Sequence, residues 1–138
     1  MARPAVSART LRLPVPVIAI VDDDEAVREA LCDLLEVEGL SARAFDGAAA
    51  LLSDTALDSF DCLVTDVRMP EIDGIELQRR LRARGATLPI LFITSTTDEP
   101  SRTQAMLGGA AAWFTKPVAD DALLRALYQA LDGRGGAP

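Results

Sequence analysis

Five short apolar segments are separated by stretches of helical pattern, and this alternation constrains the fold more than any other feature of the sequence. The segments lie at 17–21, 42–45, 62–65, 90–94 and 111–115. The first, third and fourth are apolar almost without interruption, which is typical of parallel strands that helices cover on both faces. The second, read from Ser41, alternates apolar with polar residues, which indicates a half-exposed strand at the edge of the sheet.

Apolar residues at helical spacing predict five helices that alternate with these strands. In the first helix, Val27, Leu31 and Leu34 fall on one face, and Gly39 marks its end. Asp46 and Asp98 are the expected N-caps of the second and fourth helices. The predicted helices lie at 25–38, 47–54, 74–84, 99–107 and 120–132. The strict order (βα)5 predicts an α/β fold, with a doubly wound parallel sheet and helices on both of its faces.

These elements fill one domain, residues 15–132, in a chain of 138 residues. Residues 1–14 are expected to form a flexible N-terminal extension, and the Gly-rich residues 133–138 a flexible tail or the stub of a linker. The apolar run at 15–21 is interrupted by Pro16, is too short to span a membrane and leads to no small-residue cleavage site. We therefore expect a cytoplasmic protein without membrane contact.

Composition excludes several classes of function. The 14 basic and 21 acidic residues give a net charge of −7, which argues against a nucleic acid as the partner of this chain. The sequence has no His, which excludes His acid–base catalysis, His-containing zinc sites and a phosphohistidine relay on this chain. Cys32 and Cys62 form no CxxC pair, so we interpret them as buried thiols in a reducing compartment.

Polar or charged side chains follow four of the five predicted strands at their carboxyl ends. They are Asp22, Asp23 and Asp24 after the first strand, Asp66 after the third, Thr94 at the end of the fourth, and Lys116 after the fifth. In a parallel sheet these ends meet at one edge, which is where ligands bind in doubly wound folds. We therefore expect these side chains to converge on one site.

The residue types at this edge indicate metal and phosphate chemistry. Carboxylates held close together repel one another unless a cation joins them. Because the chain offers oxygen ligands and no His, the cation is expected to be Mg²⁺ or Mn²⁺. Lys116 and the Thr94 hydroxyl can each bind a phosphoryl oxygen, and a carboxylate such as that of Asp66 can act as the nucleophile.

Each of these residues also has an ordinary structural explanation when it is taken alone. Acidic residues such as Asp24 and Glu25 are common at the start of a helix, where the helix dipole favours them. Asp66 can be a turn residue ahead of Met69, and Lys116 can be a surface residue. Such explanations would have to hold at four separate strand ends at once, which favours a shared site.

The same residues lie in motifs that resemble the receiver domain of response regulators, the phosphoryl-accepting part of two-component signalling. The motifs are VDDDEAVREAL, DCLVTDVRMPEIDGIEL, LFITS and WFTKP, in that order along the chain. The pattern DVRMPxxDGxEL and the spacings between the motifs are most similar to those of the FixJ-type receivers. The resemblance covers residues 16–132. The resemblance implies a flavodoxin-like sheet with strand order 2-1-3-4-5, a family order that agrees with the predicted edge position of 42–45.

The resemblance also implies a role for each site residue. Asp66 would accept the phosphoryl group, and Thr94 and Lys116 would bind it. Magnesium would be held by Asp66, by Asp23 directly, by Asp22 through water and by the main-chain carbonyl of Arg68. Arg68 and Thr96 flank the site and would influence the lifetime of the phosphate.

Two further features follow from the resemblance. Trp113 falls at a switch position where the family usually has Tyr or Phe, and Thr94 is its partner in the switch. As the only Trp, Trp113 is expected on the second edge strand, facing the surface of the last two helices rather than the phosphate. The Lys116–Pro117 peptide bond is expected to be cis.

The implied function is that of a receiver that takes a phosphoryl group from a histidine kinase or a phosphotransfer protein. Phosphorylation would then remodel the face formed by the last two helices and the strand between them. Such a chain is not an enzyme with a separate substrate, because it accepts and slowly loses its own aspartyl-phosphate. Its downstream partner is unidentified, and a homodimer is left open.

Two alternatives remain open. The first is that the chain is the N-terminal receiver half of a transcription factor whose DNA-binding domain is absent. A more remote alternative is a Mg²⁺-dependent phosphohydrolase, which would need a second acid to activate water and a cap over its substrate. Turnover of a phosphate ester distinguishes it from a receiver.

Overall fold

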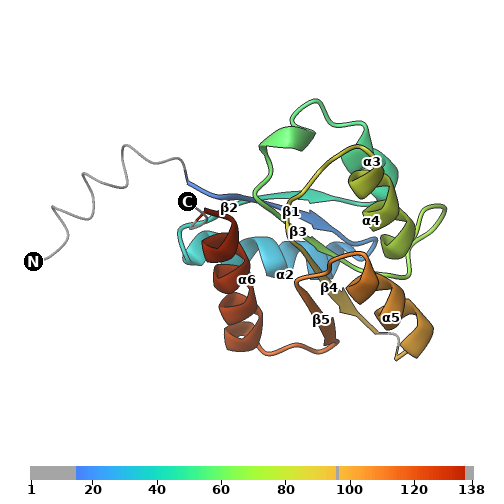
Figure 1. The fold of residues 1–138 in the computed structure, drawn as a ribbon. Coiled ribbons are helices and arrows are strands. Elements are labelled where there is room, and N and C mark those ends of the chain that lie inside the picture. The colour runs from blue at the N-terminus through green and yellow to red at the C-terminus, as the bar shows by residue number, and fades with distance from the viewer. Residues whose placement is uncertain (1–14, 96, 136–138) are drawn as a thin grey trace, which may run out of the picture.

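Five parallel strands form one sheet in the order β2-β1-β3-β4-β5, which confirms the predicted topology (Figure 1). The computed structural model describes residues 15–95 and 97–135. The predicted extension at 1–14, Thr96 and residues 136–138 lie outside the described residues. The strands are β1 (Val17–Val21), β2 (Ser41–Phe45), β3 (Cys62–Thr65), β4 (Ile90–Thr94) and β5 (Ala112–Thr115).

Helices cover both faces of the sheet, as the alternation predicted. They are α2 (Glu25–Val37), α3 (Ala48–Leu52), α4 (Gly74–Ala83), α5 (Glu99–Leu107) and α6 (Asp120–Gly135), with a short 3-10 turn, η1 (Leu57–Ser59), ahead of β3. One apolar cluster lies under α3, α4 and α5 and includes Leu77 and Leu81, which are fully buried. A second cluster lies under α2 and α6 and includes Leu35 and Leu127. Figure 1 shows these two groups of helices on opposite sides of the sheet.

Burial of the strands is most complete at the centre of the sheet. Every residue of β3 and β4 is buried, whereas β2 has only one buried residue, Phe45. The edge position of β2 explains this difference, because α2 and α3 leave much of the strand open to solvent. Arg43 on β2 forms an ion pair with Asp54 at 2.8 Å, and its guanidinium lies 5.3 Å from the centre of the Phe45 ring.

Two helix ends differ from the sequence prediction. Asp46 is not the N-cap of α3: Gly47 occupies that position, and the helix is shorter than predicted. It ends at Leu52 because the Asp54 carboxylate accepts a hydrogen bond from the Ala56 N–H and starts a new turn. At the other end of the chain, α6 continues to Gly135, so the first three residues of the predicted tail are helical.

Other helix boundaries agree with the sequence. The carboxylate of Asp24 caps α2 by accepting a hydrogen bond from the Ala26 N–H at 2.9 Å. Asp98 occupies the N-cap position of α5, as expected. Gly85, which follows the C-cap residue Arg84 of α4, adopts φ +87°, a left-handed conformation that favours glycine at a helix end. None of the helices in the described ranges is long and apolar enough to cross a membrane.

Candidate functional site

The carboxylates of Asp22, Asp23 and Asp66 come together at the carboxyl edge of the sheet. Val21 of β1 is in register with Thr65 of β3, so the residues that follow these strands lie side by side. Asp22 and Asp66 are only 2% and 5% exposed, whereas Asp23 faces solvent. One oxygen from each of the three carboxylates lies within 4.8 Å of the others. Asp22, Asp23 and Asp66 thus converge as the sequence predicted, whereas the Asp24 carboxylate caps α2 instead and is not part of this cluster.

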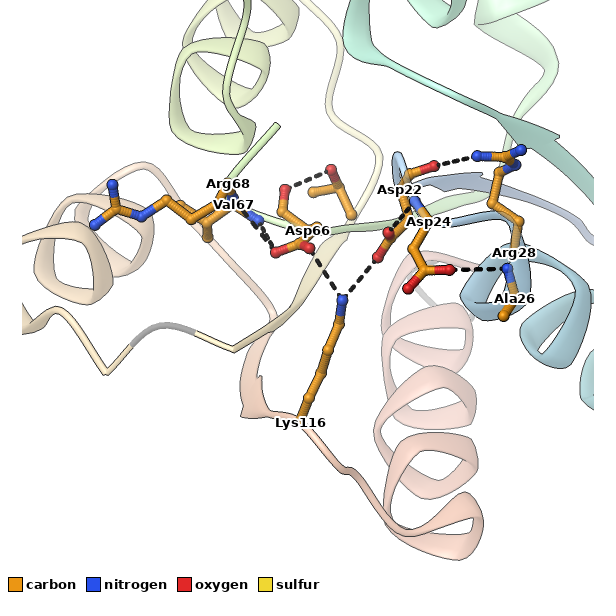
Figure 2. Close-up of polar contacts among 9 residues, drawn as sticks. Asp22, Asp24, Ala26, Arg28, Asp66, Val67, Arg68 and Lys116 are labelled. Atoms are coloured by element: carbon orange, nitrogen blue, oxygen red, sulfur yellow. Dashed lines mark hydrogen bonds and ion pairs between the residues drawn. The ribbon is translucent and has the colours of Figure 1, made fainter. Parts of the chain in front are cut away.

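Lys116 brings a positive charge into this cluster from the far edge of the sheet. Its Nζ lies 3.0 Å from Asp22 Oδ2 and 3.0 Å from Asp66 Oδ2, and Figure 2 shows the ammonium group between the two carboxylates. The Lys116–Pro117 bond is cis, as expected. The Lys116 N–H donates to the Thr94 carbonyl at 2.8 Å, which ties the end of β5 to the end of β4.

The electrostatic environment keeps Lys116 charged. Burial by itself lowers the pKa of Lys116, but the hydrogen bonds to Asp66 and Asp22 outweigh it and raise this pKa above its usual value. Burial raises the pKa of Asp22, although the Asp24 N–H and Lys116 partly offset that effect. A lysine ammonium is therefore available at neutral pH beside two buried carboxylates.

The Asp66 side chain is fixed by hydrogen bonds from its own loop. Its Oδ1 accepts the Val67 N–H at 2.6 Å and the Arg68 N–H at 3.4 Å, while Lys116 binds Oδ2. On the facing loop, Asp22 Oδ1 accepts the Asp24 N–H at 2.9 Å. These contacts hold both buried carboxylates in place on either side of the Lys116 ammonium group.

The donor set fits a small divalent cation. Three carboxylates and one ammonium leave an excess of two negative charges, which a divalent ion would neutralise. All three candidate side-chain ligands are oxygen atoms, the ligands that Mg²⁺ prefers, and the exposure of Asp23 leaves room for water on the ion. Arg68 places its N–H, rather than its carbonyl, on Asp66 in this structure. Its carbonyl as a metal ligand stays a prediction.

The two residues of the predicted switch lie on the neighbouring strands β4 and β5. Thr94 is fully buried at the end of β4, paired in register with Thr115. Trp113 is half-buried on β5, the second edge strand, with its ring centre 5.6 Å from that of Phe92. Trp113 packs with the cluster under α3, α4 and α5, whereas Phe114 packs with the cluster under α6. Its side chain therefore faces the α5 side of the strand.

The sequence analysis did not predict the contact that Gly74 makes with the site. Asp73 caps α4, and the Gly74 N–H donates to the Val67 carbonyl at 2.8 Å. A Cβ at position 74 would overlap the backbone carbonyl oxygen of Asp66. The first turn of α4 therefore packs directly on the loop that carries Asp66, and only glycine fits there.

Also unpredicted are two arginine contacts beside the site. The Arg28 guanidinium donates to the Asp22 carbonyl at 2.9 Å, and the Arg68 guanidinium forms an ion pair with Asp98 at 3.5 Å. Arg28 lies six residues after Asp22 on the first turns of α2, a spacing that could have drawn attention to it. Nothing in the local sequence connects Arg68 with Asp98, thirty residues away.

We expect Gly74→Ala to lower the free energy of unfolding by about 1–3 kcal/mol, because the added Cβ forces the backbone of α4 away from Asp66. Urea unfolding followed by far-UV circular dichroism measures this change. The control is Gly133→Ala in α6, where a Cβ meets no atom within 4 Å. That replacement should instead stabilise the protein by up to about 1 kcal/mol. Equal stability of Gly74→Ala and wild type would contradict the proposed packing.

Comparison with known proteins identifies the family. The sequence model of the response regulator receiver domain family matches residues 18–128 of the chain. The chain is 44% identical over 115 residues to the response regulator protein TodT of Pseudomonas putida, covering 83% of this chain and 51% of TodT. It is also 44% identical over 114 residues to the transcriptional regulatory protein FixJ of Azorhizobium caulinodans, covering 83% of this chain and 54% of FixJ. The chain thus spans about half the length of these relatives.

Solved structures agree with this comparison. The crystal structure of FixJ-N superposes with a TM-score of 0.78 at 32% identity, covering 87% of this chain and 96% of that one. The response regulator StyR superposes with a TM-score of 0.83 at 40% identity, covering 89% of this chain and 62% of that one. Fold, strand order and sequence therefore agree, and the chain belongs to the family of response regulator receiver domains.

Proposed function

We propose that this receiver domain accepts a phosphoryl group on Asp66 from a sensor histidine kinase or a phosphotransfer protein. The observation that carries the proposal is the position of Lys116 Nζ, 3.0 Å from both buried carboxylates of the site. A half-buried ammonium between two carboxylates stabilises the negative charge of a phosphoryl group that forms on one of them. The chain is thus a signalling protein of two-component systems rather than an enzyme with a separate substrate.

In the proposed transfer, an oxygen of the Asp66 carboxylate attacks the phosphorus of the donor. The bond from phosphorus to the donor nitrogen breaks, its electron pair stays on the donor imidazole, and a proton from water completes that ring. The N–H groups of Val67 and Arg68 orient the Asp66 carboxylate, and Lys116 binds the phosphoryl oxygens as their charge grows. A divalent cation held by Asp22 and Asp23 would supply further neutralising charge.

Loss of the phosphate would follow by slow attack of water on the same phosphorus, returning Asp66 and inorganic phosphate. The Thr94 hydroxyl is proposed to bind a phosphoryl oxygen after transfer, since Thr94 lies buried at the end of the strand next to β3. A phosphohydrolase would instead turn over a phosphate ester many times. A chain that retains the phosphoryl label and does not turn over a phosphate ester would support the function of a receiver.

An apolar groove beside the site is a proposed docking place for the phosphodonor. The groove encloses about 360 Å³ between α2 and the start of α6 and is lined mainly by apolar side chains, with Lys116 also in its wall. Asp120 lines it as well, and Glu29 and Asp33 are exposed on α2. An apolar helix ridge with basic flanking residues complements this surface, and it would bring a donor imidazole to Asp66.

A second candidate is that the chain is the receiver half of a transcriptional regulator. The observation that favours it is that the match covers only part of the relatives, 51% of the length of TodT and 54% of the length of FixJ. On this proposal the present chain itself binds no DNA, in line with its net charge of −7. Sequencing of the gene beyond the codon for Pro138 tests this candidate, because the reading frame would continue into a DNA-binding domain. In either case we propose a cytoplasmic location and a homodimer as the state to test after phosphorylation.

Intact mass spectrometry tests the proposed function. The protein is incubated with acetyl phosphate, which donates phosphate without a kinase, in the presence of Mg²⁺. We expect the mass to rise by one phosphoryl group, since one carboxylate lies within reach of Lys116 and two backbone N–H groups. An unchanged mass, under conditions in which a receiver of known activity is labelled, would contradict the proposal.

Trp113 provides an optical test of the switch. On addition of beryllofluoride and Mg²⁺, we expect its emission to shift to shorter wavelength and its quenching by iodide to fall. The reason is that movement of Thr94 toward Asp66 opens space beside β5, into which the half-buried indole can turn. The Asp66→Asn variant is the control and should show no shift. A spectrum that stays constant while Asp66 is modified would make Trp113 a static part of the core.

A further inference from the structure

Arg68 links the loop that carries Asp66 to the start of α5. Its backbone N–H lies 3.4 Å from Asp66 Oδ1, while its guanidinium extends away from that carboxylate, as Figure 2 shows. The guanidinium Nη2 lies 3.5 Å from Oδ2 of Asp98, the N-cap residue of α5. The same Asp98 oxygen accepts a hydrogen bond from Ser101 Oγ at 2.8 Å, which fixes the carboxylate on the first turn of the helix.

We propose that Arg68 has two partners, Asp98 in the resting state and the phosphoryl group once Asp66 carries one. Transfer of the guanidinium from Asp98 to the phosphoryl oxygens would release the start of α5 from the Asp66 loop. This inference rests on the proposed function, because it needs a phosphoryl group at Asp66. It assigns the Arg68 side chain a positioning role that is separate from the predicted role of its carbonyl.

Exposure and geometry favour the exchange. The Arg68 and Asp98 side chains are 63% and 32% exposed, and a separation of 3.5 Å is long for a charge-assisted hydrogen bond. An exposed pair of this kind is weak. A phosphoryl group carries up to two negative charges and three oxygens, and it accepts a bidentate pair from a guanidinium. Because the Arg68 N–H already lies 3.4 Å from the Asp66 carboxylate, the proposed exchange requires movement of the Arg68 side chain alone.

The release acts on the helix that follows Thr94 along the chain. The buried Thr94 is the last residue of β4, and Asp98 is the N-cap residue of α5. Both residues would therefore change partners on phosphorylation. Thr94 would bind the phosphoryl group, and Asp98 would lose its contact with Arg68. The start of α5 would then be free to move relative to the loop that carries Asp66.

Binding of beryllofluoride with Mg²⁺, measured by isothermal titration calorimetry, tests the proposal in four proteins. These are wild type, Asp98→Asn, Arg68→Ala and the double variant. Asp98→Asn is expected to tighten binding by about two- to fivefold. This factor corresponds to the strength of the exposed Arg68–Asp98 ion pair, which has to break in the wild type before Arg68 can bind the ligand. In the Arg68→Ala background the same Asp98→Asn change is expected to have no effect, because no guanidinium remains to be released.

Asp54→Asn is the matched control, since it breaks an exposed arginine pair, with Arg43, on the edge strand β2. It should leave the affinity for beryllofluoride unchanged. Equal tightening by Asp98→Asn with and without Arg68, or no change in either background, would overturn the proposed exchange. Wild-type protein that binds no beryllofluoride would instead contradict the proposed function, so the two failures are distinguishable.

Hydrogen exchange gives a second readout that does not depend on affinity. Asp98→Asn without any phosphoryl analogue should speed amide exchange in the first turns of α5, because the contact with Arg68 is lost. The Asp54→Asn control should leave exchange in α5 unchanged. Unaltered exchange in the Asp98→Asn variant would mean that Arg68 does not restrain the helix, and would overturn the proposal.

Discussion

Asp66→Asn should abolish phosphoryl uptake from acetyl phosphate, lowering it by more than about 100-fold, because an amide is a poor nucleophile. The replacement keeps the size of the side chain, and its amide oxygen can still accept the Val67 N–H hydrogen bond. The fold should therefore survive. Intact mass spectrometry over a time course measures the uptake, and circular dichroism confirms that the variant is folded.

The control for this variant is Asp58→Asn, an exposed carboxylate in the short turn η1. It should take up phosphate at the rate of the wild type, because it lies outside the acidic cluster. Uptake that survives Asp66→Asn undiminished would place the acceptor on another residue. Partial uptake with a new acceptor among Asp22 and Asp23 would show that the cluster is correct and the assigned nucleophile is wrong.

Removal of the divalent cation should stop phosphorylation as completely as loss of the nucleophile. Three carboxylates with oxygens within 4.8 Å of one another repel a phosphoryl dianion, and among the described residues the cation paired with them is the single ammonium of Lys116. We expect uptake from acetyl phosphate to cease in EDTA and to return with added Mg²⁺. Uptake that continues in excess EDTA would contradict the metal requirement.

The neighbouring acids Asp23 and Asp24 provide a matched pair for locating the metal site. Asp23 lies in the cluster with Asp66, whereas the Asp24 carboxylate caps α2 through the Ala26 N–H. Asp23→Asn should weaken Mg²⁺ binding about tenfold or more. Asp24→Asn should change it little, since Asn is also a good N-cap. Calorimetric titration with Mg²⁺ compares the two, and equal effects would show that the acidic pair is misassigned.

The fold could be predicted from the sequence because its strongest signals are local. Nearly uninterrupted apolar runs such as Cys62–Thr65 are typical of strands buried on both faces, and the alternation after Ser41 marks the edge. Once the strands are parallel, their carboxyl ends meet. The convergence of Asp22, Asp66 and Lys116 can then be predicted without knowing any side-chain contact. The ion pairs at 3.0 Å confirm it.

What the sequence did not predict depends on contacts between distant segments. The start of α3 is at Gly47 rather than at the good N-cap residue Asp46, so the local preference for Asp did not decide the boundary. The need for glycine at position 74 comes from the carbonyl of Asp66, and the Arg68 pair comes from the position of α5. No local spacing encodes either contact, because the packing of helices on the sheet creates both.

Chemical mapping of the phosphoryl group tests the central claim most directly. After acetyl phosphate and Mg²⁺ treatment, borohydride reduces an aspartyl-phosphate to homoserine, and trypsin then releases the fragment 44–68, which contains Asp66 and four other aspartates. Tandem mass spectrometry locates the homoserine. We predict that it stands at position 66 and that no other aspartate is converted. Homoserine at any other position, with Asp66 intact, would contradict the proposed function of this site.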